Sequence, residues 1–139
     1  MTLVVDCSFA SQALVPSQQN AHVYTLFQSF GQVQEELVAP TFLQIEFVSS
    51  LRRLESRGAI TSAESERSWQ DLLEANITFR WDIRWPERAL HISRTIGVSK
   101  AYDSLYLACA EALGVELVTC DARFFRAAIP LFPGQLRFA

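Results

Sequence analysis

The sequence has few of the residues that stabilise secreted or metal-bound small proteins. Among its 139 residues there are only three Cys, five Gly and five Pro. Cys7, Cys109 and Cys120 are an odd number and lack the spacing of metal ligands, so neither a disulfide framework nor a zinc site is expected. We expect reduced thiols that pack as small apolar side chains.

Neither a signal peptide nor a membrane span is expected. Asp6 interrupts the first apolar stretch too early for a signal peptide, and no later run approaches the length of a membrane span. The expected location is therefore the cytoplasm, without membrane attachment. The net charge of −3 excludes a wholly basic surface, and Lys100 is the only Lys beside eleven Arg. Arg suits bidentate contacts with phosphates.

What is present is an alternation of short apolar strands with helices. Half of the residues are apolar, which is enough for one core in a single domain spanning residues 1–139. The expected strands are 2–5, 37–39, 77–83, 116–120 and 136–138. The expected helices are one capped by Ser8, then 20–31, 41–57, 61–75, 86–97, 99–113 and 122–128. This order predicts a three-layer α/β/α fold around a central, mostly parallel sheet of about five short strands.

Apolar spacing predicts which face of the helix over 41–57 is buried. Its apolar positions recur every three residues, which favours a buried stripe along one side. The stripe comprises Phe42, Ile45, Val48, Leu51 and Leu54. Further along the chain, Thr61 followed by Glu64 predicts a capping box at the start of the next helix.

Four acidic residues stand where a water-facing charge is not expected. Asp6 and Asp121 follow apolar strands, Asp103 lies near the start of an apolar helix, and Glu46 lies between apolar neighbours. Strand ends on one rim of a parallel sheet bring Asp6 and Asp121 together. Burying and gathering carboxylates is costly unless a cation compensates the charge. Oxygen ligands without His or Cys favour Mg²⁺, with Mn²⁺ as a possible substitute.

Four stretches around these acids resemble the PIN domain, and within it the VapC-type toxins of bacterial toxin–antitoxin pairs. The resemblance covers nearly the whole chain, in the order and spacing of the family. The matching stretches are Leu3-Val4-Val5-Asp6-Cys7-Ser8, Ala39-Pro40-Thr41-Phe42-Leu43-Gln44-Ile45-Glu46 leading to Leu51-Arg52-Arg53, Tyr102-Asp103-Ser104-Leu105-Tyr106-Leu107-Ala108, and Leu117-Val118-Thr119-Cys120-Asp121-Ala122-Arg123-Phe124.

The resemblance implies a Mg²⁺-dependent endoribonuclease that dimerises and is held inactive by a small antitoxin. Asp6 and Asp103 would be the main metal ligands, and Asp121 would hold the metal directly or through water. Glu46 would orient a water on the metal or complete its shell. Thr119 matches a hydroxyl position of the family, and Ser8 and Ser104 are further supporting candidates. The segment 80–85, rich in aromatic residues and Arg, matches no family motif.

Each of these acids also has a purely structural interpretation. Asp6 and Asp121 could cap the helices that follow them, and Asp103 could complement a helix dipole. Glu46 could reach solvent or pair with an Arg. The four together favour a site over four separate structural roles.

Other polar and aromatic residues have two interpretations each. Arg52, Arg53 and Arg57 could guide RNA phosphates or form the solvated end of a helix. The three Trp residues favour packing in the core or a dimer over base stacking, and both His residues are interpreted as structural. These residues are Trp69, Trp81, Trp85, His22 and His91. A PIN nuclease outside toxin–antitoxin pairs and a catalytically silent binding module are the alternative functions.

Overall fold

Short strands and helices alternate along the chain, as the sequence predicts. The computed structural model describes all of residues 1–139, with five strands and seven helices. The strands are β1 (Thr2–Val5), β2 (Glu36–Pro40), β3 (Ile77–Arg80), β4 (Glu116–Thr119) and β5 (Leu136–Phe138). The helices are α1 (Cys7–Leu14), α2 (Ala21–Gln32), α3 (Phe42–Ser56), α4 (Ser62–Glu74), α5 (Trp85–Ile96), α6 (Tyr102–Leu113) and α7 (Ala122–Ala128).

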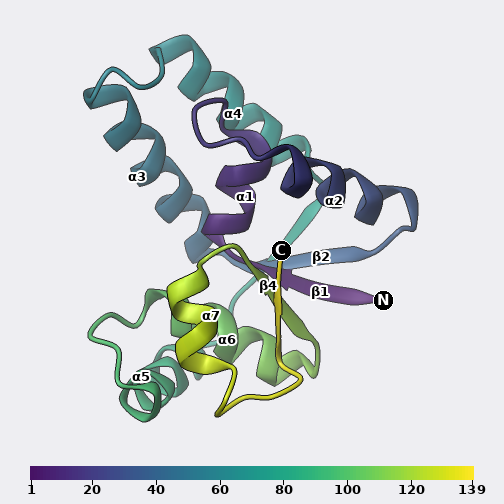
Figure 1. Cartoon of the computed structure of the whole chain (residues 1–139), viewed down its shortest axis with the longest axis vertical. Helices are drawn as coiled ribbons and strands as arrows, with labels where there is room; N and C mark the ends of the chain where they lie inside the picture. Colours follow the sequence, from purple (N-terminus) through teal and green to yellow (C-terminus); the bar gives the residue numbers. More distant parts are fainter.

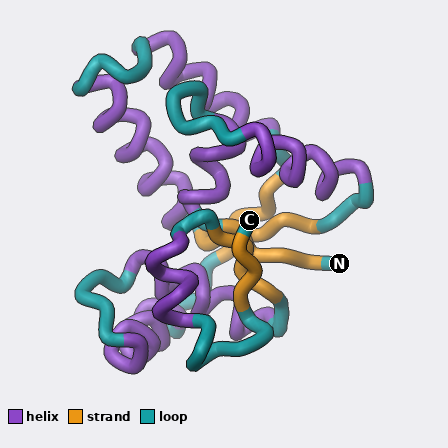
Figure 2. The backbone as a smooth tube through the Cα atoms, in the orientation of Figure 1, coloured by secondary structure: helices purple, strands orange, loops and turns teal.

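The strands form one sheet in the order β3-β2-β1-β4-β5, and every neighbouring pair is parallel. Helices α1 to α4 lie on one side of the sheet, and α5, α6 and α7 lie on the other (Figure 1). In Figure 2 the strands run between these two groups of helices. The predicted three-layer α/β/α fold with a sheet of five short strands is confirmed, and the sheet is wholly parallel.

Apolar side chains of the sheet and both helix layers form one connected core of 33 buried residues. Leu3, Val4 and Val5 of β1 are at most 1 % exposed, because helices cover both faces of a parallel sheet. The very apolar α6 packs against β1, β2 and β4. None of the helices has the length and apolar character that crossing a bilayer requires.

The buried stripe of α3 differs from the predicted one. The structure buries Leu43, Phe47, Leu51 and Leu54. Ile45 and Val48 of the predicted stripe are instead 58 % and 40 % exposed. A step of three residues turns a helix through less than a full circle, so the predicted stripe drifts around the axis. The buried residues are spaced by four, four and three positions, which keeps them on one face of the helix. Ile45 and Val48 lie outside that face and outside the core.

Strand β3 ends earlier than predicted. Alternation of apolar residues predicted a strand over 77–83, but β3 ends at Arg80. Beyond it, the Asp82 carboxylate accepts the backbone N–H of Arg84 at 2.8 Å and the Arg84 guanidinium at 2.6 Å. A short Asp side chain that binds the backbone two residues on favours a turn. This turn leads the chain into α5 and explains why the apolar alternation does not continue as a strand.

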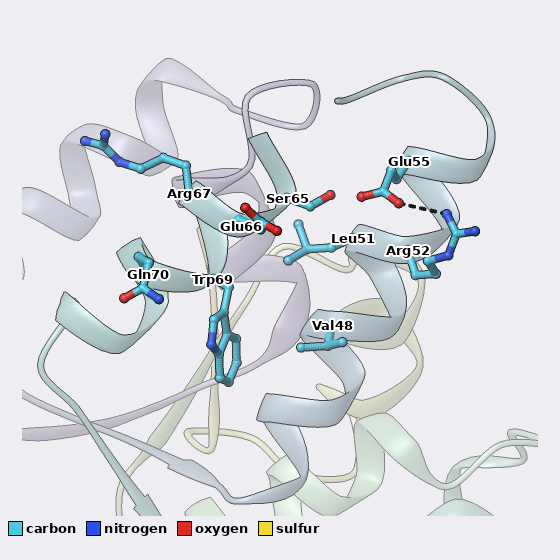
Figure 3. Close-up of a pocket in the computed structure, with 9 residues that line it drawn as sticks. All are labelled: Val48, Leu51, Arg52, Glu55, Ser65, Glu66, Arg67, Trp69 and Gln70. Atoms are coloured by element: carbon cyan, nitrogen blue, oxygen red, sulfur yellow. Dashed lines mark hydrogen bonds and ion pairs between the residues drawn. The ribbon is translucent and has the colours of Figure 1, made fainter. Parts of the chain in front are cut away.

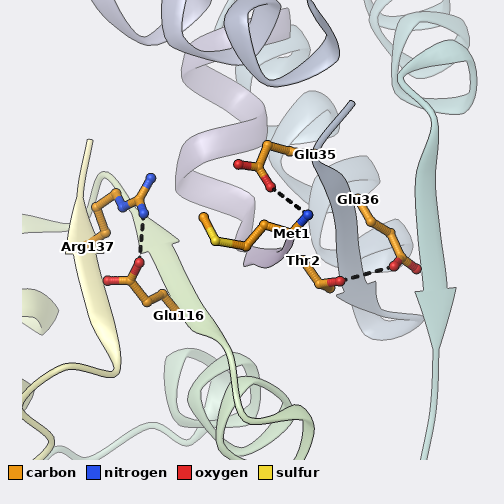
Figure 4. A network of polar contacts seen from close by, with 6 residues as sticks. All are labelled: Met1, Thr2, Glu35, Glu36, Glu116 and Arg137. Atoms are coloured by element: carbon orange, nitrogen blue, oxygen red, sulfur yellow. Dashed lines mark hydrogen bonds and ion pairs between the residues drawn. The ribbon is translucent and has the colours of Figure 1, made fainter. Parts of the chain in front are cut away.

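Acidic side chains at the amino ends of the strands have polar partners (Figure 4). Glu36 accepts a hydrogen bond from Thr2 at 3.1 Å, and Arg137 pairs with Glu116 at 2.7 Å. Glu35 lies 3.5 Å from the ammonium group of Met1. The charges of Glu35 and Glu116 are therefore paired within the chain, whereas Glu36 has only the neutral Thr2 hydroxyl as a partner.

Candidate active site

The carboxyl ends of β1 and β4 form the switch point of the sheet. From β1 the chain continues to β2 on one side, whereas β4 continues to β5 on the other. The crevice at such a point is the usual ligand site of an open parallel sheet. Asp6 directly follows β1, and Asp121 lies two residues beyond the end of β4, after Cys120.

Helices bring the other two predicted acids to the same crevice. Glu46 lies near the start of α3, and Asp103 lies in the first turn of α6. Glu46, Asp103 and Asp121 line a hollow of about 270 Å³ whose remaining wall comes mainly from α1. Asp6 is only 2 % exposed, and its charge acts on Asp103. The structure therefore gathers all four acids that the sequence singled out.

Asp6 is held on three sides. Its Oδ1 accepts hydrogen bonds from the Ser8 hydroxyl at 2.7 Å and from the backbone N–H of Phe9 at 2.9 Å. Its Oδ2 accepts the Thr119 hydroxyl at 2.5 Å. The prediction that Ser8 caps α1 is wrong, because Asp6 takes that place with its own carboxylate. Burial raises the pKa of Asp6 to about 6, although these three hydrogen bonds oppose the rise.

Two hydroxyl groups join the ends of β1 and β4. Ser8 Oγ accepts the backbone N–H of Cys120 at 2.9 Å, and Thr119 Oγ1 accepts that of Asp121 at 3.1 Å. Both hydroxyls donate to Asp6. Ser8 and Thr119 therefore fix Asp6 relative to the loop that carries Asp121. Ser104, the third supporting candidate, is fully buried and shares a 2.9 Å hydrogen bond with Ser93 of α5, away from the carboxylates.

Asp121 and Asp103 have unused oxygen atoms. Asp121 caps α7 by accepting the backbone N–H of Phe124 on Oδ1 at 2.9 Å, which leaves Oδ2 free. Capping and ligand binding are therefore compatible for this residue. The Asp103 carboxylate has no hydrogen-bond donor, and burial together with the charges of Asp6 and Asp121 raises its pKa to about 6. Within the chain, the negative charge of Asp103 is stabilised only by the dipole of α6, because the residue lies in the first turn of that helix.

Glu46 is oriented by a residue that sequence reasoning did not single out. The buried Tyr106 hydroxyl donates to Glu46 Oε1 at 2.5 Å. Burial raises the pKa of Glu46, and the Tyr106 hydrogen bond opposes this rise. No Arg forms an ion pair with Glu46, so the Arg-paired interpretation is wrong. Tyr106 belongs to the motif around Asp103, but its partner lies 60 residues away, and no local signal reveals that contact.

Tyr106→Phe tests this positioning role. We expect kcat for RNA cleavage to fall about tenfold, the low end for a residue that acts through another, while KM is unchanged. Loss of the hydrogen bond raises the pKa of Glu46. The acid limb of the pH–rate profile therefore moves to higher pH. Tyr24→Phe, which alters an exposed tyrosine on α2, is the control. An unchanged kcat with an unmoved acid limb would contradict the role.

The carboxylates have free oxygen atoms that could bind a divalent cation. A carboxylate offers about four lone pairs, and Asp6 uses three of them, which leaves one on Oδ2. Asp103 is free on both oxygens and Asp121 on one. All are oxygen donors, which suits Mg²⁺ or Mn²⁺. No three of these side chains converge closely enough to form a ready-made cage.

The three predicted RNA-contacting arginines lie on different faces of α3. Arg53 donates to Ser50 of the acid-lined hollow at 3.2 Å, and its charge acts on Glu46. Arg52 pairs with Glu55 at 2.9 Å on the side of α3 that faces α4. Arg57 is an exposed residue at the end of the helix. Only Arg53 is therefore placed beside the carboxylates.

The Trp and His residues lie outside the acid site, whereas Cys7 lines its hollow and Cys120 lies close enough to Asp6 for that charge to act on its thiol. Trp85 belongs to the core, Trp69 packs against it, and Trp81 meets Trp85 edge to face. Both His residues are exposed. All three cysteines are free and lie in or against the core, and burial raises the pKa of each thiol to about 12. Cys7 lines the hollow but is unsuited to be a nucleophile, because its thiolate form is disfavoured.

The switch-point site and the fold agree with comparisons to known proteins. The model of the PIN domain family matches residues 3–130, and the chain belongs to this family. It is similar to Ribonuclease VapC9 of Mycobacterium tuberculosis, with 32 % identity over 121 residues that cover 87 % of each chain. Ribonuclease VapC12 of the same species is 28 % identical over 122 residues, which cover 87 % of this chain and 88 % of that protein.

Solved structures share the same architecture at lower identity. VapBC2 from Rickettsia felis, bound to a DNA fragment from their promoter, superposes with a TM-score of 0.70 at 12 % identity, covering 100 % of this chain and 99 % of that one. PAE2754 from Pyrobaculum aerophilum gives 0.65 at 21 % identity and covers 92 % and 88 %. FitAcB from Neisseria gonorrhoeae gives 0.60 at 19 % and covers 91 % and 92 %. These structures establish the PIN fold.

Proposed function

We propose that this chain is a Mg²⁺-dependent endoribonuclease and the toxin of a type II toxin–antitoxin pair, acting as a homodimer. The observation that carries the proposal is the group of four carboxylates at the switch point. None of them has an ionic partner within the chain, whereas Glu35 and Glu116 at the opposite edge do. Similarity to two VapC ribonucleases supports RNA as the substrate, and the resemblance to VapC-type toxins implies a small antitoxin as the partner.

The roles divide according to the oxygen atoms that each residue has free. Asp6, Asp103 and Asp121 would hold the cation, with Asp6 fixed by Ser8 and Thr119. Glu46 accepts no hydrogen bond on Oε2, so this oxygen is available to orient the attacking water. A bound divalent cation lowers the pKa of water and stabilises charge on the phosphate during displacement. Arg53 would contact the RNA backbone beside Glu46.

Cleavage of RNA by purified protein, freed of any partner, tests the proposal. We expect a broad panel of structured RNAs to include substrates that are cut with Mg²⁺ or Mn²⁺, with cleavage stopped by EDTA and restored by excess metal. Asp103→Asn should be inactive under the same conditions. No cleavage of any RNA would favour the silent binding module, and cleavage that continues in EDTA would exclude the proposed chemistry.

A second hollow, between α3 and α4, suits the antitoxin. It has a volume of about 570 Å³, and the residues that line it (Figure 3) include none of the four carboxylates. Val48 and Trp69 give it an apolar floor, and the Arg52–Glu55 pair and Arg67 lie at its sides. Val48 is exposed although α3 buries its opposite face. An amphipathic segment of the antitoxin would cover this apolar floor and contact the charges beside it.

Val48→Asp separates antitoxin binding from cleavage. We expect the affinity for the purified product of a short neighbouring reading frame to fall at least about tenfold, because a carboxylate is buried against an apolar segment. RNA cleavage by the variant should be unchanged. Val33→Asp, at an exposed position outside the groove, is the matched control. Calorimetric titration measures both affinities, and equal binding by Val48→Asp and the native chain would exclude this groove.

A further inference from the structure

The acid site opens into a larger hollow on the side of α7. This hollow has a volume of about 570 Å³ and lies between the loop that precedes α6 and the first turns of α7. Asp103 and Asp121 belong to its wall and also to that of the smaller hollow beside α1. Lys100 and Arg123 line the same larger hollow. The two hollows therefore meet at the two carboxylates, and only the larger one carries basic side chains.

Lys100 and Arg123 are not engaged within the chain. Both are exposed, and neither lies within ion-pair distance of Asp103, Asp121 or any other acid. Arg88, by contrast, makes a two-bond pair with Glu111 at 2.6 and 2.8 Å on the other side of α6. Cations that share a hollow with carboxylates without pairing to them keep their charge available for a ligand.

We propose that Lys100 and Arg123 bind the RNA phosphate next to the scissile one. This inference rests on the proposed ribonuclease function. A strand whose scissile phosphate lies at Asp103 and Asp121 must place its flanking phosphates on the two sides of these residues. The smaller hollow is lined by uncharged polar groups and Glu46, and the neighbouring cation Arg53 already donates to Ser50 and acts on Glu46. The larger hollow offers an ammonium and a guanidinium, which form charge-assisted hydrogen bonds to phosphate oxygens.

The alternative role for these cations is to lower the repulsion between Asp103 and Asp121. In that case their removal would strengthen binding of Mn²⁺ in the absence of RNA, because no other positive charge would then offset the two carboxylates. A phosphate-binding role leaves Mn²⁺ affinity nearly unchanged and weakens RNA binding. Titration with Mn²⁺ alone and with RNA therefore distinguishes the two roles.

Lys100→Ala and Arg123→Ala measure the contribution of each cation. We expect each to raise KM for RNA about tenfold and to leave kcat within about twofold, because the lost contact is to a non-reacting phosphate. Lys100→Arg should restore most of the loss. The matched control is Arg126→Ala, which removes the same charge from α7 but from a position outside the hollow. Equal KM for Arg123→Ala and the native chain would overturn the proposal, as would an equal effect of Arg126→Ala.

Replacing one charged phosphate of the RNA with an uncharged linkage shows which phosphate Lys100 and Arg123 contact. Once a cleaved bond has been mapped, an RNA with a methylphosphonate at one of the two flanking linkages should bind the native protein about tenfold more weakly. The same methylphosphonate should not weaken RNA binding by Arg123→Ala any further. For the native protein, losing this one phosphate contact should reduce the slope of log affinity against log salt concentration by about 0.7. If the methylphosphonate and Arg123→Ala weakened RNA binding independently of each other, the proposed contact between Arg123 and that phosphate would be wrong. A native protein that cuts no RNA would instead refute the proposed function, so the two failures are distinguishable.

Discussion

Asp6→Asn is expected to abolish metal-dependent RNA cleavage, with a loss of about a thousandfold or more in kcat. Such a loss corresponds to about 4 kcal/mol of transition-state stabilisation. The physical reason is that Asn removes the charge of the most deeply buried acid of the site, which is 2 % exposed and lies at the end of β1. Mn²⁺ binding should weaken in parallel. Single-turnover cleavage and Mn²⁺ titration measure the two losses.

The fold of Asp6→Asn should survive because Asn can replace each contact. Asn is as good a helix N-cap as Asp, so the bond from Phe9 is kept. The amide NH₂ can donate to Thr119 if that hydroxyl turns toward Ser8 Oγ, which lies 3.3 Å away. Asp71→Asn, which removes the charge of a half-buried partner of Arg67 on α4, is the control that keeps activity. Undiminished cleavage by a folded, metal-requiring Asp6→Asn protein would refute the assigned role.

The second large effect is on stability without metal. Burial raises the pKa of Asp6 from 3.8 to about 6, so the folded chain holds a proton more tightly than the unfolded chain. Its contribution to folding stability therefore falls as the pH rises from about 4 to about 6, and it stays low above that. A shift of this size corresponds to about 3 kcal/mol. In metal-free buffer at pH 7.5, Asp6→Asn should be more stable than the native chain.

Thermal unfolding at two pH values measures this effect. We expect Asp6→Asn to raise Tm by on the order of 10 °C at pH 7.5 in EDTA, and to have little effect at pH 4. Mg²⁺ should raise the Tm of the native chain at pH 7.5 and leave that of Asp6→Asn nearly unchanged. Asp71→Asn should show neither difference. A Tm difference between Asp6→Asn and the native chain that does not depend on pH would contradict the buried carboxylate as its source.

Much of this site could be predicted from the sequence because its acids violate local expectations. Asp6 and Asp121 end apolar strands, and parallel strands bring such ends to one rim. Asp103 and Glu46 interrupt apolar helical patterns. Thr119 was found through the family motif, and the structure supplies its physical task of holding Asp6 at the end of a neighbouring strand.

The contacts that sequence reasoning missed depend on tertiary packing. The partner of Tyr106 lies on another helix, and a tyrosine in an apolar helix gives no sign of what its hydroxyl meets. The predicted buried stripe of α3 is partly wrong because, over a short range, apolar residues spaced by three resemble one face of a helix. Lys100 and Arg123 flank two different acids in the sequence, and only the fold brings them to one hollow.

The central claim is that the carboxylates at the ends of β1 and β4 hold the divalent cation that supports RNA cleavage. Anomalous diffraction from crystals grown with Mn²⁺ tests this claim most directly. We expect a peak within ligand distance of Asp6, Asp103 and Asp121, and no such peak in Asp103→Asn crystals. A peak only at another site, or none in a protein whose RNA cleavage requires Mn²⁺, would contradict the claim.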